Sequence, residues 1–249
     1  MEWRKLLLEQ PYLADRCAQV KGCKRFFPDK AKECASGWAA ILPENLKLVG
    51  EFAEWGYSNK KALCDFLSCN SNSQFIDWCD NANIWTKFDF KEWRKLLLAQ
   101  PQFADRCDKI NGWENFYSRD WCKLLSKQPQ LADRCDKVNG WEKFKSGSWR
   151  RLLSKQPQFA DRLDKLNGWN KFNSWDWDKL LFYQPQFADR CDKVNGWEKF
   201  DSTNWRYLLL EQPQFADRCD KWEEFDGEDW SNLLSAQPQL ADRRKNQSK

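Results

Sequence analysis

The sequence contains no histidine and only one methionine, Met1, and these absences narrow the functions that the chain can have. Histidine is the commonest general base and the commonest transition-metal ligand in proteins. Its absence excludes Ser-His and Cys-His nucleophile pairs and any histidine-based metal site. We therefore expect a protein without catalytic residues, without a bound metal and without a cofactor.

Long hydrophobic runs are also missing. Charges interrupt residues 1–20 every few positions, so we expect no signal peptide, and no window approaches the roughly 18 apolar residues that span a bilayer. The 11 cysteines are odd in number and include no Cys-x-x-Cys pair, which favours reduced thiols over a disulfide framework. These features predict a soluble, cytoplasmic protein with no membrane partner. The net charge of +4 creates no strong field that would demand nucleic acid.

The sequence does contain an internal repeat. The dipeptide Gln-Pro recurs every 28 residues, at Gln100, Gln128, Gln156, Gln184 and Gln212, and once more at Gln237. Each copy begins with a tryptophan, which we number position 0, as in WCKLLSKQPQLADRCDKVNGWEKFKSGS from Trp121. The chain length corresponds to about nine repeats, so 1–249 is predicted to be a single solenoid. It divides into an N-terminal repeat over 1–26, degenerate repeats over 27–92, regular repeats over 93–229, and a truncated capping repeat with a polar tail over 230–249.

One repeat has the pattern of two short helices and a helical turn. The first helix is predicted to begin at the polar residue before position 0, such as Asp120 or Ser148, and to end before the proline at position 8. That proline starts a second helix with an apolar stripe at positions 10, 11, 14 and 17. Asn-Gly at positions 18 and 19 ends it, because both residues tolerate the left-handed conformation, and Gly-Trp-x-x-Phe forms a short helical turn. Helices this short need stacking, so the predicted fold class is all-α, an α-solenoid.

Tryptophan occupies positions 0 and 20 in 13 of its 17 occurrences. Regularly spaced exposed aromatics could stack sugars or bases. Both positions, however, share a helical face with leucine or phenylalanine, which favours a buried core. The cysteine at position 14 is also predicted to be core, because Leu163 replaces it in one repeat. The four tryptophans outside the pattern are better candidates for function: Trp38, Trp55, Trp78 and Trp175.

Two further positions are uniform in the seven clear repeats. Asp at position 12 and Arg at position 13 always occur together, as in Asp161-Arg162. Such rows could bind cations or phosphates, but a polar ladder between neighbouring repeats explains them and is the favoured interpretation. Gln at position 7 is expected to bond the backbone of the turn between the two helices.

The pattern WxxLLxxQPQFADxCD followed by GWxxF resembles the Trp-rich, QPQFAD-type tandem repeats found in long arrays in some bacterial proteins. The resemblance covers 3–26 and 93–244 well and 27–92 poorly. It implies a repeat architecture and carries no activity with it. In organisation the chain is similar to ankyrin and tetratricopeptide arrays, which are mainly protein-binding scaffolds.

Differences between repeats concentrate at positions 1, 2, 5 and 6 of the first helix, which lie opposite the Trp-Leu-Leu face and are predicted to face solvent. Apolar and aromatic residues interleave there with arginine and lysine, as is typical of protein recognition surfaces. Contacts of the solenoid with itself are the alternative explanation. The candidate partner-binding residues are Leu98, Lys123, Lys127, Arg150, Arg151, Lys155, Trp175, Phe182, Tyr183, Tyr207 and Leu210.

Charge is uneven along the chain. Residues 121–176 carry 12 Lys and Arg against 6 Asp and Glu, whereas residues 205–229 carry 3 against 8. Because this mixture suits a protein better than a nucleic acid groove, we expect a non-enzymatic scaffold that acts as an adaptor or an inhibitor. The alternative is modular binding of RNA or single-stranded DNA through the basic repeats 121–176. A thiol-dependent enzyme is disfavoured, because no cysteine is flanked by an identifiable base.

Overall fold

The computed structural model describes residues 60–69 and 73–247. The expectations for the N-terminal repeat 1–26, for Trp38 and for Trp55 lie outside these residues. All regular structure in the described ranges is helical and recurs with the repeat period, which confirms an all-α solenoid of tandem repeats. No helix within those ranges is long and apolar enough to cross a bilayer.

The first helix of each repeat begins one turn earlier than the sequence pattern predicted. In α13 (Ser174–Tyr183) the N-cap is Asn173, whose side chain accepts a hydrogen bond from the Asp176 backbone N–H at 2.8 Å. The predicted cap, Asp176, therefore lies inside the helix. The prediction was wrong because the repeat has a second polar residue three positions upstream, and a capping side chain bonds the N–H three residues onward. The first helices are α5 (Lys60–Cys69), α7 (Phe90–Ala99), α9 (Ser118–Leu125), α11 (Ser146–Leu153), α13, α15 (Ser202–Glu211) and α16 (Gly227–Ala236).

The proline at position 8 separates the two helices, as predicted. Gln156 before it has φ −136° and ψ 71°, outside the helical region, and the proline then opens a 3₁₀ turn that leads into the second helix. The second helices are α6 (Ser73–Asn81), α8 (Ala104–Lys109), α10 (Ala132–Lys137), α12 (Ala160–Lys165), α14 (Ala188–Lys193) and α17 (Ala241–Gln247). The repeat from Trp205 lacks three residues near its Asn-Gly position, and its second helix is 3₁₀ throughout, over Pro213–Arg218.

The two residues of the Asn-Gly pair have different structural roles. The asparagine has φ between 48° and 53° in every described copy, so it takes the left-handed conformation that ends the second helix. No described glycine has positive φ, so the expectation of backbone freedom was wrong for glycine. Glycine is needed at this position because there is no space for a side chain. A Cβ added to Gly168 would lie 2.0 Å from Leu163 Cδ1, and one added to Gly112 would lie 2.7 Å from Cys107 Sγ. The predicted helical turn then follows as 3₁₀ helices over Ile84–Lys87, Gly112–Asn115, Gly140–Lys143, Gly168–Lys171, Gly196–Lys199 and Trp222–Glu224.

Two rows of tryptophan form the core, as predicted, although Trp197 and Trp222 of the position-20 row are only half-buried. The described tryptophans at position 0 are at most 4% exposed. Trp169 at position 20 stacks on Trp177 of the next repeat, with ring centroids 5.4 Å apart, and contacts Phe187 at 5.5 Å. Position 17 was expected to be part of this core, but it is not, since Leu166 is 36% exposed. Aromatic contacts therefore help to hold each repeat to the next.

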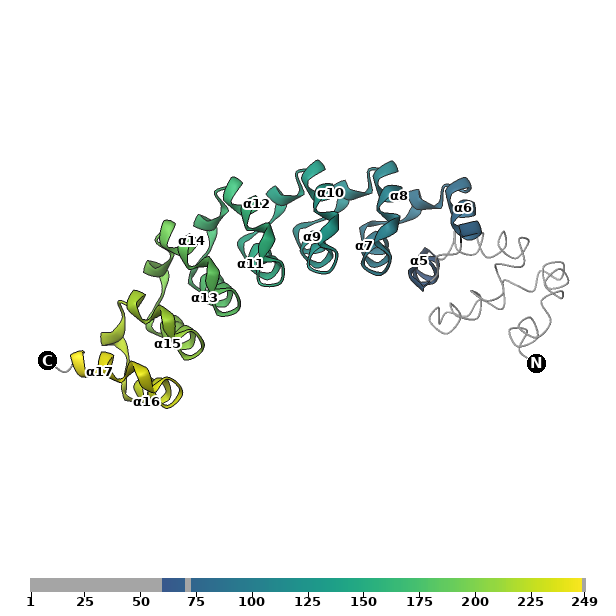
Figure 1. Ribbon diagram of the computed structural model, residues 1–249. Coiled ribbons are helices and arrows are strands. Elements are labelled where there is room, and N and C mark those ends of the chain that lie inside the picture. Colours follow the sequence, from purple (N-terminus) through teal and green to yellow (C-terminus); the bar gives the residue numbers. More distant parts are fainter. Residues whose placement is uncertain (1–59, 70–72, 248–249) are drawn as a thin grey trace, which may run out of the picture. The chain divides into compact units, whose positions relative to one another are not determined.

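Residue contacts divide the chain into two compact parts. The first part contains the described residues up to Phe116 and Gln130–Val138, and the second part contains Tyr117–Pro129 and the residues from Asn139 onward. Within the second part, α11, α13, α15 and α16 lie side by side in one row, and the second helices α12, α14 and α17 lie in another (Figure 1). The second part therefore has a first-helix surface and a second-helix surface.

Candidate partner-binding surface

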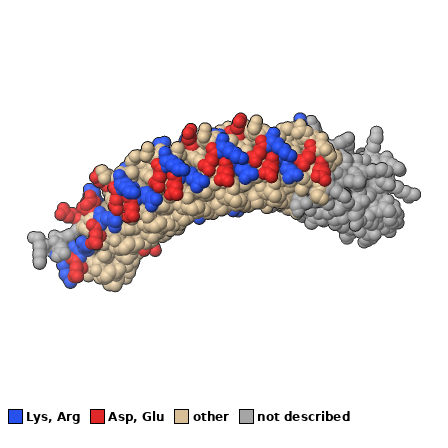
Figure 2. Space-filling view, turned by 45° about the horizontal axis from the view of Figure 1, so that its top comes forward, with Lys and Arg blue, Asp and Glu red and all other residues tan. Residues whose placement is uncertain are grey.

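The second-helix surface carries a ladder of ion pairs. Arg190 Nη2 lies 3.4 Å from Asp164 Oδ2, and Arg218 Nη2 lies 3.1 Å from Asp192 Oδ2. In these pairs the arginine at position 13 reaches the aspartate at position 15 of the preceding repeat. Acidic and basic side chains consequently alternate on this surface (Figure 2). The ladder was predicted, but with the aspartate at position 12 as the acid; that aspartate takes part in the pair of Arg243 with Asp217.

Asp192 shows how the ladder is tied to the core. It accepts hydrogen bonds from the Arg218 guanidinium and from the Trp197 indole N–H. Burial opposes its ionisation, but these two donors lower the pKa of Asp192 below its ordinary value. The charges of the second-helix surface are thus used to hold neighbouring repeats together.

The glutamine at position 7 also belongs to the framework. Gln184 Nε2 donates to the Ser154 carbonyl oxygen at 2.9 Å, and Gln184 Oε1 accepts from Gln186 Nε2 at 2.6 Å. The carbonyl lies in the turn that follows the first helix of the preceding repeat, so the expected bond to an interhelical turn is present, and it joins two repeats. Such a carbonyl has no partner in its own helix, and the glutamine supplies one. The same bond joins Gln156 to Ser126, Gln212 to Phe182 and Gln237 to Leu210.

Position 1 of the first helix was predicted to face solvent, and this prediction was wrong, because the position faces the neighbouring first helix. Cys122 is 6% exposed and Asp178 is 2% exposed. The Cys122 thiol donates to the Ser148 carbonyl oxygen at 3.4 Å, and Arg150 Nε donates to Asp176 Oδ1 at 3.2 Å. Position 1 therefore serves contacts between repeats, which is the alternative that the sequence left open.

Position 5 is shared between the framework and the surface. Among the candidate residues, Leu98, Phe182 and Leu210 occupy it, and all three are half-buried. Phe182 packs edge to face against Tyr183, with ring centroids 4.9 Å apart. Leu98 lies on α7 in the first part of the chain, whereas the ten other candidates lie in the second part.

Positions 2 and 6 leave positive charge on the first-helix surface without compensation. The four candidate residues on α9, α11 and the turns that follow them are exposed, and none has an ion pair within the described residues: Lys123, Lys127, Arg151 and Lys155. The acids of the three first helices α9, α11 and α13 are all buried, at no more than 3% exposure: Asp120, Asp176 and Asp178. This surface consequently attracts negative charge, in contrast to the paired ladder on the second helices.

Exposed aromatic rings lie beside these charges. Trp175 is 50%, Tyr183 62% and Tyr207 50% exposed, on α13 and α15. The Arg150 guanidinium lies over the Trp175 ring, 3.9 Å from its centroid, and the Arg206 guanidinium lies 4.9 Å from the centroid of Tyr207. Burial of such rings contributes strongly to protein interfaces. We call the exposed residues Lys123, Lys127, Arg151, Lys155, Trp175, Tyr183 and Tyr207 the first-helix patch.

The sequence missed two residues near this patch. Arg206 stacks on Tyr207, and its partner Asp229 belongs to the next repeat. The sequence signal that would have found it is the arginine at position 1, which Arg150 also occupies in an earlier repeat. Tyr117 is 66% exposed, but it precedes α9 and thus lay outside the positions that were compared.

The buried cysteines of the described residues provide no reactive thiol. No described cysteine forms a disulfide, and all of them except Cys69 are buried. Burial raises the pKa of the Cys107 and Cys191 thiols far above the ordinary value and that of Cys219 to about 12. These thiols are protonated near neutral pH and are poor nucleophiles. The described residues also contain no group of three or more Cys, Asp or Glu side chains that could hold a metal ion.

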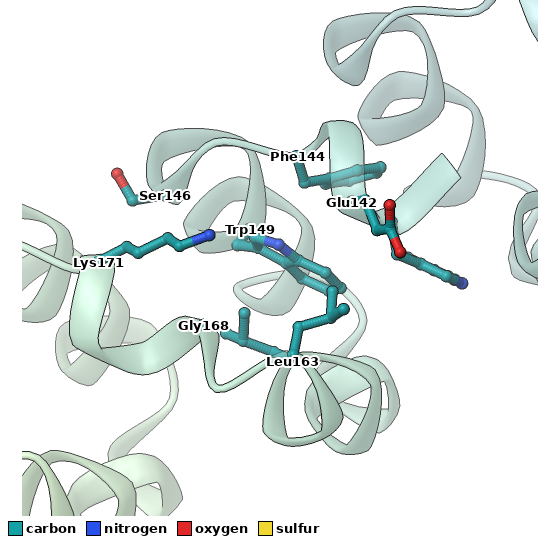
Figure 3. A pocket seen from close by; sticks show the side chains of 9 residues that line it. Glu142, Phe144, Ser146, Trp149, Leu163, Gly168 and Lys171 are labelled. Carbon is teal, nitrogen blue, oxygen red and sulfur yellow. The ribbon is translucent and has the colours of Figure 1, made fainter. Parts of the chain in front are cut away.

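A small hollow lies beside Trp149. Its volume is about 100 Å³, and Trp141, Phe144, Gly168 and Lys171 are among the residues that line it (Figure 3). Ligand pockets commonly measure about 300–1,000 Å³. The hollow is therefore a packing defect beside the aromatic core and not a pocket for an organic ligand.

The fold and the surface together define the class as a tandem helical-repeat protein, an α-solenoid. In comparisons with known proteins, no family model, curated protein or solved structure matches this chain.

Proposed function

We propose that the protein is a non-enzymatic repeat scaffold that binds a protein partner through the first-helix patch. One observation carries the proposal: the charged and polar framework groups are bonded between repeats, whereas the bases of the patch have no partner among the described residues. Unpaired charge next to exposed tryptophan and tyrosine is the composition of an interface anchor. The protein acts either as an adaptor that holds its partner or as an inhibitor that covers the partner's own functional site.

The proposal extends to the family and the compartment. The recurrence of Trp, Phe and Asp in every described repeat supports membership of the bacterial Trp-rich tandem repeats that the motif resembles. The described cysteines form no disulfide, which supports a reducing compartment such as the cytoplasm.

Single-stranded RNA or DNA is the second candidate. The cluster of lysine and arginine side chains without ion pairs on α9 and α11 favours it. Nucleic acid binding would use Lys123, Lys127, Arg151 and Lys155 for phosphates and the aromatic rings for bases. Affinity would then fall steeply with salt.

The test is capture of partners by the immobilised full-length chain from a nuclease-treated lysate. The proposal predicts a captured protein that is lost with the variant Tyr183→Ala/Tyr207→Ala. The control is Leu166→Ala, which removes an exposed apolar side chain on the second-helix side and should leave capture unchanged. Capture that disappears with nuclease, or that is insensitive to Tyr183→Ala/Tyr207→Ala, would refute the proposal.

A further inference from the structure

The charge of the first-helix patch changes along the chain. Its basic end covers α9 and α11, where exposed bases are unpaired and the acids are buried. Its aromatic end covers α13 and α15, and exposed Glu211 closes α15. A partner that matches both ends is negative over α9 and α11 and apolar over α13 and α15.

The spacing of the first helices limits the shape of such a partner. Successive first helices of this part contact one another, and packed helices lie about 8–10 Å apart. A chain in the polyproline II conformation rises about 3.1 Å per residue and completes a turn in three residues, about 9.3 Å. Every third side chain of such a segment therefore meets a new repeat. The span from α9 to α15, roughly 24–30 Å, corresponds to about eight to ten residues.

A polynucleotide fits the patch less well. One face of the Trp175 ring is covered by Arg150, and Arg206 lies over Tyr207, so those faces are already stacked. A phosphate backbone that continued along the row would meet Glu211 on α15. An aliphatic side chain can pack on ring edges as well as on ring faces, and the apolar end of a short acidic segment carries no charge that would meet Glu211.

From this arrangement we propose that the occupant of the first-helix patch is an extended acidic protein segment. Its carboxylates, three residues apart, contact the bases of α9 and α11, and an apolar side chain beyond them packs on Trp175, Tyr183 and Tyr207. Arg151 can bind a carboxylate with two parallel hydrogen bonds, whereas the lysines act as point charges. This inference rests on the proposed function, because it names the partner of the same surface.

The test begins with selection of random twelve-residue peptides, displayed on phage, against the immobilised full-length chain. The expected peptides carry acidic residues three positions apart and an apolar residue beyond them. Binding of a selected peptide, labelled with fluorescein, is then measured by anisotropy. Because exposed ion pairs contribute modestly, the variant Lys123→Glu/Lys155→Glu should weaken binding about tenfold.

A matched variant controls for net charge. Lys165→Glu/Lys193→Glu makes the same charge change at exposed lysines of the second helices and should leave the affinity within about twofold. The inference is overturned if selected peptides lack acidic residues or carry them seven apart, as a helix would. Equal weakening by both variants overturns it, and so does preferential binding of a labelled ten-nucleotide single-stranded RNA. Self-association of the chain that Lys123→Glu/Lys155→Glu abolishes would make a second copy the occupant.

The two proposals fail in different ways. If the captured partner is lost with Tyr183→Ala/Tyr207→Ala but retained by Lys123→Glu/Lys155→Glu, the surface binds a protein that is not an acidic segment. If neither variant changes capture, the proposed function itself is wrong.

Discussion

Replacement of Gly112 by alanine tests why the repeat needs glycine at position 19. A Cβ at Gly112 would lie 2.7 Å from Cys107 Sγ, and the next atoms are the Cys107 carbonyl oxygen at 3.4 Å and Ile110 Cδ1 at 3.6 Å. Only the sulfur is too close. Because the backbone of Gly112 has no positive φ, alanine meets a steric obstacle and no conformational one.

The expected magnitudes follow from this geometry. Overpacking of a close-packed core costs about 1–3 kcal/mol, so Gly112→Ala should lower the free energy of unfolding by that amount. Cys107→Ala alone removes a small buried group and should cost about 1 kcal/mol. In the double variant the new methyl group occupies space left by the sulfur. The double variant should therefore be more stable than additivity predicts, by about 1 kcal/mol or more.

Urea unfolding of the full chain, followed by circular dichroism and tryptophan fluorescence, measures these free energies. Gly147→Ala is the control: no atom lies closer than 4.0 Å to the new Cβ, and the site is within α11. That variant should gain about 0.5–1 kcal/mol. Additive effects of Gly112→Ala and Cys107→Ala would refute the steric explanation, since a backbone requirement could not be relieved by loss of a thiol.

Three further variants test the framework by the same unfolding measurement. Gln184→Ala should cost about 1–3 kcal/mol, because the Ser154 carbonyl oxygen loses its donor. The pKa of Asp192 is lowered in the folded state, so its ionised form stabilises the fold above the unfolded pKa, and this contribution is lost as the pH falls through the folded pKa. Arg218→Ala removes one cause of the lowered pKa, so stability should fall less steeply below about pH 4 in this variant. Burial raises the pKa of Asp178, which favours its neutral form, so Asp178→Asn should add about 1 kcal/mol at pH 7 and progressively less as the pH falls through the folded pKa.

Each of these has an outcome that contradicts it. Gln186→Ala removes only the outer, exposed amide, so a cost equal to that of Gln184→Ala would show that the carbonyl bond is unimportant. If the stability of Arg218→Ala falls with acid as steeply as that of the unchanged chain, the ion pair of Arg218 with Asp192 does not contribute to the free energy of unfolding. Loss of stability in Asp178→Asn would mean that the ion pair with Lys179, 3.2 Å long, outweighs the burial of the carboxylate.

The core could be predicted from the sequence because its signal is local and repeated. Trp177 and Leu180 lie on one face of a short helix whatever the neighbouring repeat does, and both are fully buried. The proline break after Gln184 is equally local. The N-cap residues were harder to predict, because Asn173 and Asp176 can both cap a helix and only the observed start of α13 distinguishes them.

The candidate surface was found only in part. Repeat comparison identified the variable positions, but it could not show that Asp178 is buried while Tyr183 is 62% exposed. The two residues lie on different sides of one helix, and the neighbouring first helix covers only one of them. Tyr117 escaped because it precedes the helix in which positions were compared.

The sequence by itself determined the period, the helical class and the tryptophan core, because each depends on spacing within one repeat. Only the tertiary structure decided which groups meet between repeats. Arg218 could have paired with an aspartate at position 12 or 15, and the stacking of the repeats brings Asp192 within reach. The same stacking buries the acids and leaves Lys123 and Lys155 unpaired. Burial and pairing depend on neighbours about one repeat away in the chain, which is why no single repeat could show which surface carries unpaired charge.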